Sequence, residues 1–266
     1  MTTIDALHQW TLIQITDTHL MDQVDAEFVK MNPEFSFRTV MQDVLSQHAH
    51  IDALIHTGDL AQVPVQATYD RYLNYMQQTS LQHYQIPGNH DNAAIFPFKE
   101  GINQANIFHL GNWSIILLNS AVKGQIDGWI EQEHLQQLDT LLTEYADRHI
   151  IVACHHHPFI MHSRWIDQHR LKNTEHLTDV LARHTHVKMV LCGHVHQDSC
   201  HEWNGIDFLS TPATSVQFRP RSDQFALDDE APGYRVLRLF SDGQYQTEVK
   251  RVILAQQKIN AEISGY

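Results

Sequence analysis

The sequence is poor in cysteine, in positive charge and in long apolar runs, and each shortage excludes a class of protein. Only three cysteines occur among 266 residues, too few for a disulfide-stapled secreted scaffold, so we expect free thiols in a reducing cytoplasm. No run approaches the roughly 18–20 apolar residues of a membrane span. Residues 1–10 lack a basic stretch followed by an apolar one, so no secretory signal is expected.

Positive charge is scarce relative to negative charge. Lys and Arg number 18 against 31 Asp and Glu, which gives a formal net charge of −13 with histidine neutral. This balance disfavours binding to nucleic acid or to an anionic membrane, because phosphate groups need compensating cations. An acidic protein can still attract an anionic substrate where bound metal ions supply local positive charge. The placement of the 21 histidines is therefore informative.

Apolar runs alternate with amphipathic segments along the chain, which predicts an α/β fold with buried sheets. After about residue 198 the pattern becomes β-rich and ends in a hairpin at Ser241-Asp242-Gly243. We expect residues 1–266 to form one domain, with a core at 1–197 and a β-rich extension at 198–266. The expected strands are 11–16, 53–56, 82–86, 114–119, 150–154, 187–192, 208–210 and 236–240, and the expected helices are 37–48, 65–76, 131–145 and 174–184.

Five of the apolar runs end in a short cluster of residues that can bind metal. In open α/β sheets, ligands collect beyond the carboxyl ends of the strands, so we expect these clusters to meet at one rim. Carboxylate, amide and imidazole together suit borderline divalent ions such as Mn, Fe, Zn or Co, and the number of groups suits two ions sharing one carboxylate. The clusters are Asp17-Thr-His19, Gly58-Asp59, Gly88-Asn-His-Asp91, His155-His-His-Pro158 and Gly193-His-Val-His196.

Each cluster alone has an ordinary explanation. Gly-Asp is among the commonest turn pairs, and His-x-His on a strand can be a solvated edge. Their joint occurrence favours the metal site. Three glycines, Gly58, Gly88 and Gly193, stand directly before a proposed ligand, where glycine allows the sharp turn that aims the next side chain back at the rim.

In this order, the blocks D-x-H, G-D, G-N-H-D, H-x-P and G-H-x-H resemble the calcineurin-like metallophosphoesterase family over residues 17–196. The resemblance implies a four-layer αββα sandwich with a binuclear metal centre at one end. Three consecutive histidines stand where the family has H-x-P, so His155 remains the alternative to His156. The implied ligands are Asp17, His19 and His196 for the first metal, Asn89, His156 and His194 for the second, and Asp59 as the bridge.

Further stretches resemble the bacterial class III cyclic-AMP phosphodiesterases of this family. They are 15–20, 155–158, 165–169, 191–194, 211–218 and the terminal 264–266. This resemblance implies hydrolysis of 3′,5′-cyclic AMP to 5′-AMP by a hydroxide that bridges the metals, with Fe or Mn preferred over Zn or Co. His90 would contact phosphate or protonate the leaving oxygen, and Asp91 would orient His90. The implied substrate contacts are His19, Asp59, Asn89, His90 and His196.

Two rival functions stay open. The scaffold could act on another phosphodiester or on a nucleotide monoester, because a fold does not determine a substrate. The chain could also be a noncatalytic metal-binding regulatory protein. The expected partner is a small cyclic nucleotide, with no nucleic acid and no membrane, and the sequence leaves a homodimer as an open alternative.

Overall fold

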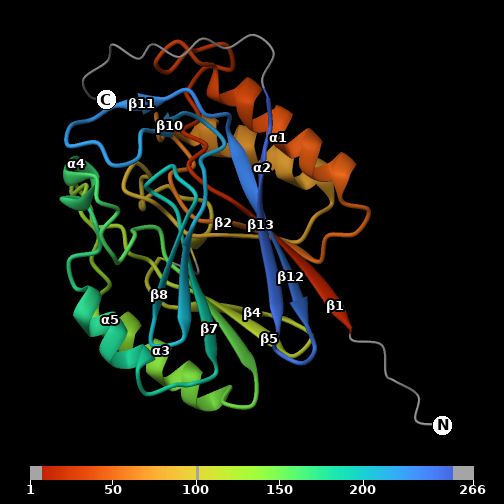
Figure 1. Ribbon diagram of the computed structural model, residues 1–266. Coiled ribbons are helices and arrows are strands. Elements are labelled where there is room, and N and C mark those ends of the chain that lie inside the picture. The colour runs from red at the N-terminus through yellow and green to blue at the C-terminus, as the bar shows by residue number, and fades with distance from the viewer. Residues whose placement is uncertain (1–7, 100–101, 254–266) are drawn as a thin grey trace.

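The computed structural model describes residues 8–99 and 102–253, so the terminal Ser264–Tyr266 lies outside the described residues. Two sheets stack face to face, and helices cover the outer side of each (Figure 1). The strand order is β13-β12-β1-β2-β3 in the first sheet and β4-β5-β6-β7-β9-β8 in the second. The predicted four-layer αββα sandwich is confirmed.

The first sheet contains β1 (Gln9–Ile15), β2 (Ala53–His56), β3 (His83–Gln85), β12 (Gly233–Phe240) and β13 (Tyr245–Arg251). The three strands β1, β2 and β3 run parallel, and β12 joins the other side of β1 in antiparallel pairing. Helices α1 (Pro33–Gln47) and α2 (Gln66–Thr79) cover its outer face. Successive side chains of β1 alternate between layers: Ile13 packs under these helices and Leu12 packs between the sheets.

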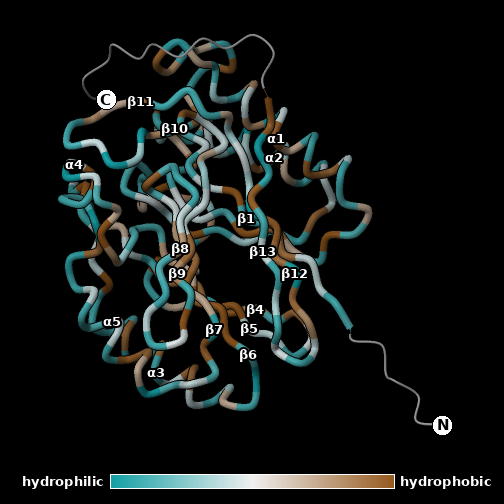
Figure 2. The backbone as a smooth tube through the Cα atoms, viewed as in Figure 1, coloured by the Kyte–Doolittle hydropathy of each residue, from teal (hydrophilic) through white to brown (hydrophobic). Residues whose placement is uncertain are grey.

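The second sheet contains β4 (Asn106–Leu110), β5 (Trp113–Leu117), β6 (His149–Ala153), β7 (Val187–Cys192), β9 (Ile206–Ser210) and β8 (Ser199–Trp203). Its four inner strands β5, β6, β7 and β9 are parallel. Helices α3 (Gln132–Glu144) and α5 (Thr174–Leu181) bury Leu135, Leu138 and Leu177 against its outer face. Figure 2 shows the resulting pattern, with hydrophobic strands inside and hydrophilic segments outside.

Four of the described strands after residue 198 extend the two large sheets, and the other two, Gln217–Phe218 and Leu227–Asp228, pair in a separate small sheet. The expected hairpin around Ser241–Gly243 is the β12–β13 pair, and β8 and β9 extend the second sheet. The sequence patterns did not predict β4, β8, the short pair β10 (Gln217–Phe218) and β11 (Leu227–Asp228), or the one-turn helix α4 (Arg164–Asp167). The edge strand β8 reads Ser-Cys-His-Glu-Trp and buries none of its residues fully, so it lacks an apolar signal.

Helix α1 begins four residues before the predicted start at Phe37. Asn32 caps it, since the Asn32 Oδ1 accepts a hydrogen bond from the Phe35 amide at 2.8 Å, and Pro33 occupies the first turn. In the described part of the chain, no helix has both the length and the apolar character needed to cross a membrane.

Candidate metal centre

The loops that follow β1, β2, β6 and β7 meet at one end of the sandwich. Backbone hydrogen bonds join the first two loops, from the Asp17 amide to the Gly58 carbonyl and from the His19 amide to the Asp59 carbonyl, both at 3.0 Å. The Gly193 amide donates to the His155 carbonyl at 3.0 Å, and this bond joins the loops that follow β6 and β7. Parallel strands in both sheets therefore deliver their carboxyl ends to a single rim, as predicted from the clusters.

Five of the predicted ligand residues have a left-handed backbone. This conformation costs a non-glycine residue about 1–2 kcal/mol, and it persists only where the surroundings impose it. In both the D-x-H and the H-x-H blocks, the first and third residues adopt it, which is a loop geometry and not the extended strand of a solvated edge. The φ values are 53° for Asp17, 48° for His19, 52° for Asp59, 67° for His194 and 50° for His196.

The three glycines of the motifs leave room for the ligands. A methyl group on Gly88 would lie 2.1 Å from the Asp59 Oδ1, and one on Gly193 would lie 2.1 Å from the Thr16 Oγ1 and 2.7 Å from the Asp17 Oδ2. Only Gly58 among these three also has a positive φ, of 102°. Close approach is thus the main requirement at Gly88 and Gly193, and turn geometry adds to it at Gly58.

The first group of side chains surrounds Asp17. The His196 Nε2 lies 3.3 Å from the Asp17 Oδ1, and the His19 Nε2 lies 3.8 Å from the same oxygen. The two imidazole Nε2 atoms are 3.1 Å apart. All three residues are buried, with an exposure of at most 1%.

The second group surrounds Asp59. The His155 Nε2 lies 3.3 Å from the Asp59 Oδ2 and 3.2 Å from the Asn89 Oδ1. The same Asp59 oxygen is 3.7 Å from the His19 Nε2, so Asp59 stands between the two groups. The His194 ring lies 5.1 Å from the His155 ring, and its buried Nε2 has no hydrogen-bond partner among residues 8–99 and 102–253.

The proton positions on the histidines make these groups fit a cation. The His196 Nδ1 lies 2.7 Å from the Val216 carbonyl oxygen, and the His155 Nδ1 lies 2.7 Å from the Thr57 carbonyl oxygen. Because a carbonyl only accepts, each Nδ1 must donate, and in the neutral ring the Nε2 then presents its lone pair to the site. These ring nitrogens and the carboxylate and amide oxygens form a mixed nitrogen and oxygen donor set, which fits two divalent ions.

Burial controls the protonation of several of these groups. Burial lowers the pKa of His19 to about 3 and holds that of His194 well below its usual value, so both rings are neutral. At His155 burial also acts to lower the pKa, but the carboxylates of Asp59 and Asp17 and the Thr57 carbonyl together outweigh it and raise the pKa to about 9. Metal binding at His155 would therefore release a proton.

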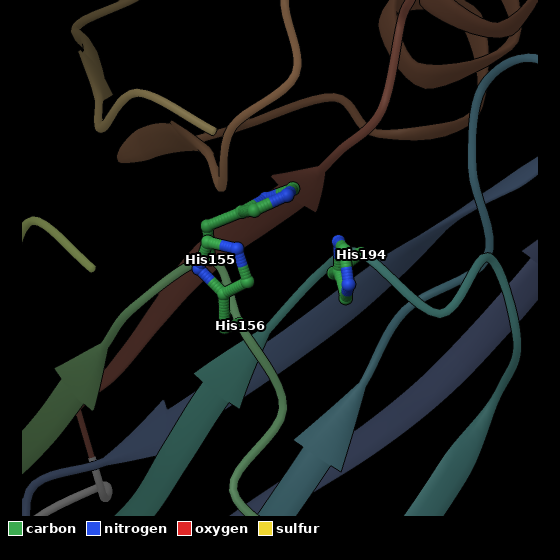
Figure 3. A group of neighbouring side chains, drawn as sticks. All are labelled: His155, His156 and His194. Carbon is green, nitrogen blue, oxygen red and sulfur yellow. The ribbon is translucent and has the colours of Figure 1, made fainter. Parts of the chain in front are cut away.

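His156, which the family spacing favours as a ligand over His155, has both ring nitrogens engaged elsewhere. Its Nδ1 lies 2.8 Å from the Ser120 Oγ, and its Nε2 lies 3.0 Å from the Ile126 carbonyl oxygen. Figure 3 shows His155 and His156 leaving the end of one strand and His194 leaving the next, with the three rings gathered together. The hydrogen bonds favour His155 as the ligand that faces Asp59 and Asn89.

His90 and Asp91 follow Asn89 on the loop after β3. The His90 amide donates to the Asp59 Oδ1 at 2.8 Å, and the half-buried His90 ring lies 5.0 Å from that of His19. The Asp91 Oδ2 accepts from the Gly88 and Leu60 amides at 2.9 and 3.1 Å. Asp91 thus ties its own loop to the loop that carries Asp59, a task that the sequence reasoning did not assign to it.

Several residues that orient the ligands were missed by the sequence reasoning or left undecided. The His19 Nδ1 lies 2.8 Å from the Gln62 Oε1, and the ring of Phe218 stacks on that of His196 at 3.9 Å and 13°. The Thr57 and Val216 contacts come from main-chain oxygens, which any residue type offers, so no sequence signal marks them. Phe218 lies in the 211–218 stretch, which the sequence singled out only as part of the family resemblance.

Comparisons with known proteins agree with this geometry. The family model of the calcineurin-like phosphoesterases matches residues 11–198. Two curated relatives are each named 3′,5′-cyclic adenosine monophosphate phosphodiesterase CpdA. The one from Haemophilus influenzae is 38% identical and the one from Escherichia coli K12 is 36% identical, each over 96% of this chain and 94% of the relative.

Solved structures share the fold at low sequence identity. A dimetal phosphatase from Danio rerio has a TM-score of 0.60 at 16% identity, covering 92% of this chain and 99% of that one. A purple acid phosphatase from yellow lupin has a TM-score of 0.64 at 12% identity, covering 96% of this chain and 53% of that one. From the family match, the relatives and the shared fold, we conclude that the chain belongs to the calcineurin-like phosphoesterase family.

Proposed function

We propose that this protein is a binuclear metal-dependent phosphodiesterase that hydrolyses 3′,5′-cyclic AMP to 5′-AMP. The observation that carries the substrate assignment is the similarity to relatives named as cyclic-AMP phosphodiesterases, which extends over 96% of the chain. The β-rich segment after residue 198 lies within that similarity, in agreement with the proposal that residues 1–266 form one domain with a core at 1–197.

Asp17, His19 and His196 would hold the first metal, and Asn89, His155 and His194 the second, with Asp59 between them. His155 replaces His156 in this set because only its Nε2 faces Asp59 and Asn89, at 3.3 and 3.2 Å. The mixed nitrogen and oxygen donors support Fe or Mn, with Zn or Co as alternatives. Bound in this way, two such ions lower the pKa of water and neutralise charge on phosphoryl oxygens.

The residues around the metals would bind and orient the substrate. His90 stands half-buried beside Asp59, so its ring could contact the phosphate and donate a proton to the departing ribose 3′ oxygen. Asp91 would keep His90 in place through the loop, because its carboxylate holds the Gly88 and Leu60 amides. His19, Asp59, Asn89 and His196 would contact the substrate from the floor of the site.

The test is turnover of cyclic AMP by protein reconstituted separately with Mn and with Fe, with the product identified by chromatography. We expect 5′-AMP, and we expect Asp59→Ala to abolish it. Parallel assays with 2′,3′-cyclic nucleotides and with simple phosphate monoesters separate the rival substrates. Brisk cleavage of these alternatives without turnover of cyclic AMP would refute the substrate assignment, and two bound metals without any hydrolysis would favour the noncatalytic regulatory protein.

His90→Ala tests the catalytic role of His90 directly. We expect turnover to fall about 100-fold or more, the usual effect of removing a general acid, while two metals stay bound. Unchanged turnover would show that His90 is only structural.

We also propose that the protein works in the cytoplasm. Its three cysteines are free, and Cys154 and Cys192 are buried, in agreement with a reducing compartment. Cell fractionation tests this location. A homodimer remains a proposal, which light scattering of the purified protein tests.

A further inference from the structure

His156 is a buried histidine beside the metal centre that the proposed function does not use. Its exposure is 0%, and its ring lies 4.9 Å from that of His155 and 4.7 Å from that of His194. Both of these neighbours are proposed ligands of the second metal. A side chain in this position either binds metal itself or determines where its neighbours can lie.

The hydrogen bonds of His156 determine its tautomer. The Ile126 carbonyl can only accept, so the His156 Nε2 must carry a proton and donate across 3.0 Å. In the neutral ring, the Nδ1 then accepts from the Ser120 hydroxyl at 2.8 Å. The Ser120 Oγ in turn accepts from the His156 amide at 3.1 Å, which completes a closed set of hydrogen bonds. No lone pair of this imidazole is left for a metal.

The partners of His156 both belong to the segment 119–130, which connects β5 to α3. The segment folds back on itself, since the Trp129 amide donates to the Ser120 carbonyl at 3.0 Å. The backbone of the segment also packs closely against the imidazole, since a methyl group on Gly128 would lie only 2.3 Å from the His156 Cγ. The face of His156 opposite the ligands is thus covered by this segment.

We infer that His156 is a positioning residue that clamps the segment 119–130 to the end of β6 and holds the rings of His155 and His194 in place for the second metal. The inference rests on the metal centre of the proposed function and not on its substrate. The segment carries Ile126 and Trp129, exposed at 54% and 40%, so the clamp also determines where these apolar side chains stand beside the centre.

Two near-isosteric variants separate the two hydrogen bonds. His156→Gln places an amide NH₂ where the Nε2 lay and can still donate to the Ile126 carbonyl. His156→Asn places an oxygen where the Nδ1 lay, so it keeps the hydrogen bond to Ser120 and loses the one to the Ile126 carbonyl. The matched control is His50→Gln, because the His50 side chain is 79% exposed and lies outside the site.

The first readout is trypsin cleavage after Lys123, an exposed lysine within the segment. Losing the hydrogen bond to the Ile126 carbonyl, which lies close to Lys123 in the sequence, should increase the opening of the segment around Lys123 about five- to tenfold. We therefore expect cleavage at Lys123 to accelerate by that factor in His156→Asn, and to stay within about twofold of the wild type in His156→Gln and in His50→Gln. Equal cleavage rates in all four proteins would overturn the inference.

The second readout is the metal-to-protein ratio at saturating Mn. A positioning residue leaves two metals bound at saturation in both His156 variants, although the apparent affinity in His156→Asn falls about 10- to 100-fold, as for other groups that orient ligands. Loss of one metal from both variants, with two retained in His155→Gln, would make His156 the ligand and overturn the inference.

If His156→Asn does not fold, Gly128→Ala displaces the same segment and should show the same faster cleavage with two metals bound. Neither trypsin cleavage nor metal content depends on turnover of cyclic AMP. A failure of the substrate assignment, which the turnover assay detects, is therefore distinguished from a failure of this inference.

Discussion

Replacing Gly88 with alanine should disable the metal centre by displacing Asp59. The added methyl group would lie 2.1 Å from the Asp59 Oδ1 and 2.4 Å from the Asp59 amide nitrogen, where ordinary contacts begin at 3.4 Å. The Asp59 amide nitrogen belongs to the backbone and cannot rotate away from the methyl group. The loop that carries Gly88 and the loop that carries Asp59 must therefore separate by roughly 1 Å, the difference between 2.4 and 3.4 Å. A displacement of that size at a reacting centre costs about 100-fold in rate. Forcing an extra methyl group into a packed site should also lower the free energy of unfolding by about 1–3 kcal/mol.

The assay measures kcat/KM for cyclic AMP, the metal content, and urea unfolding of the same preparations. Gly205→Ala is the matched control, because Gly205 lies in the β8–β9 turn with a φ of 76°, and no atom of the described residues lies within 4 Å of the added carbon. It should lose only about 1–2 kcal/mol through backbone strain and keep its turnover. A Gly88→Ala protein with wild-type kcat/KM and two bound metals would refute the steric argument, and an equal loss of turnover in the control would show that the effect is not local.

Three further outcomes follow from the same contacts. His155→Gln should bind one metal fewer than the wild type, measured by elemental analysis; retention of two metals would count against His155 as a ligand. Asp91→Asn should lower the free energy of unfolding by about 2–3 kcal/mol in urea titrations, because an amide NH₂ cannot accept from the Ala61 amide and the Tyr69 hydroxyl as the second carboxylate oxygen does. Removing metal with a chelator should lower the Tm by several degrees, since ligands that bind only the native state stabilise it by about 2.7 kcal/mol at 100 times Kd; an unchanged Tm in calorimetry would contradict a centre coupled to folding.

The sequence alone was sufficient for the architecture and for the positions of most candidate ligands. Continuous apolar runs predicted the inner strands, and two of them, Ala53–His56 and Val187–Cys192, have the predicted bounds. The polar clusters directly after these runs indicated a common rim, because parallel strands end on the same side. Edge strands such as β8 escaped prediction, since they bury too little surface to need an apolar pattern.

The tertiary structure was needed wherever the answer depended on the direction of a side chain or on a main-chain atom. His155 and His156 are adjacent and chemically identical, so their spacing to Pro158 cannot tell which imidazole faces Asp59. The chain path after β6 decides it: one ring faces Asp59 and Asn89, and the other turns to Ser120 and the Ile126 carbonyl. The carbonyls of Thr57 and Val216, which orient His155 and His196, are likewise invisible in the sequence, because every residue carries the same group and only the fold brings it within hydrogen-bonding distance.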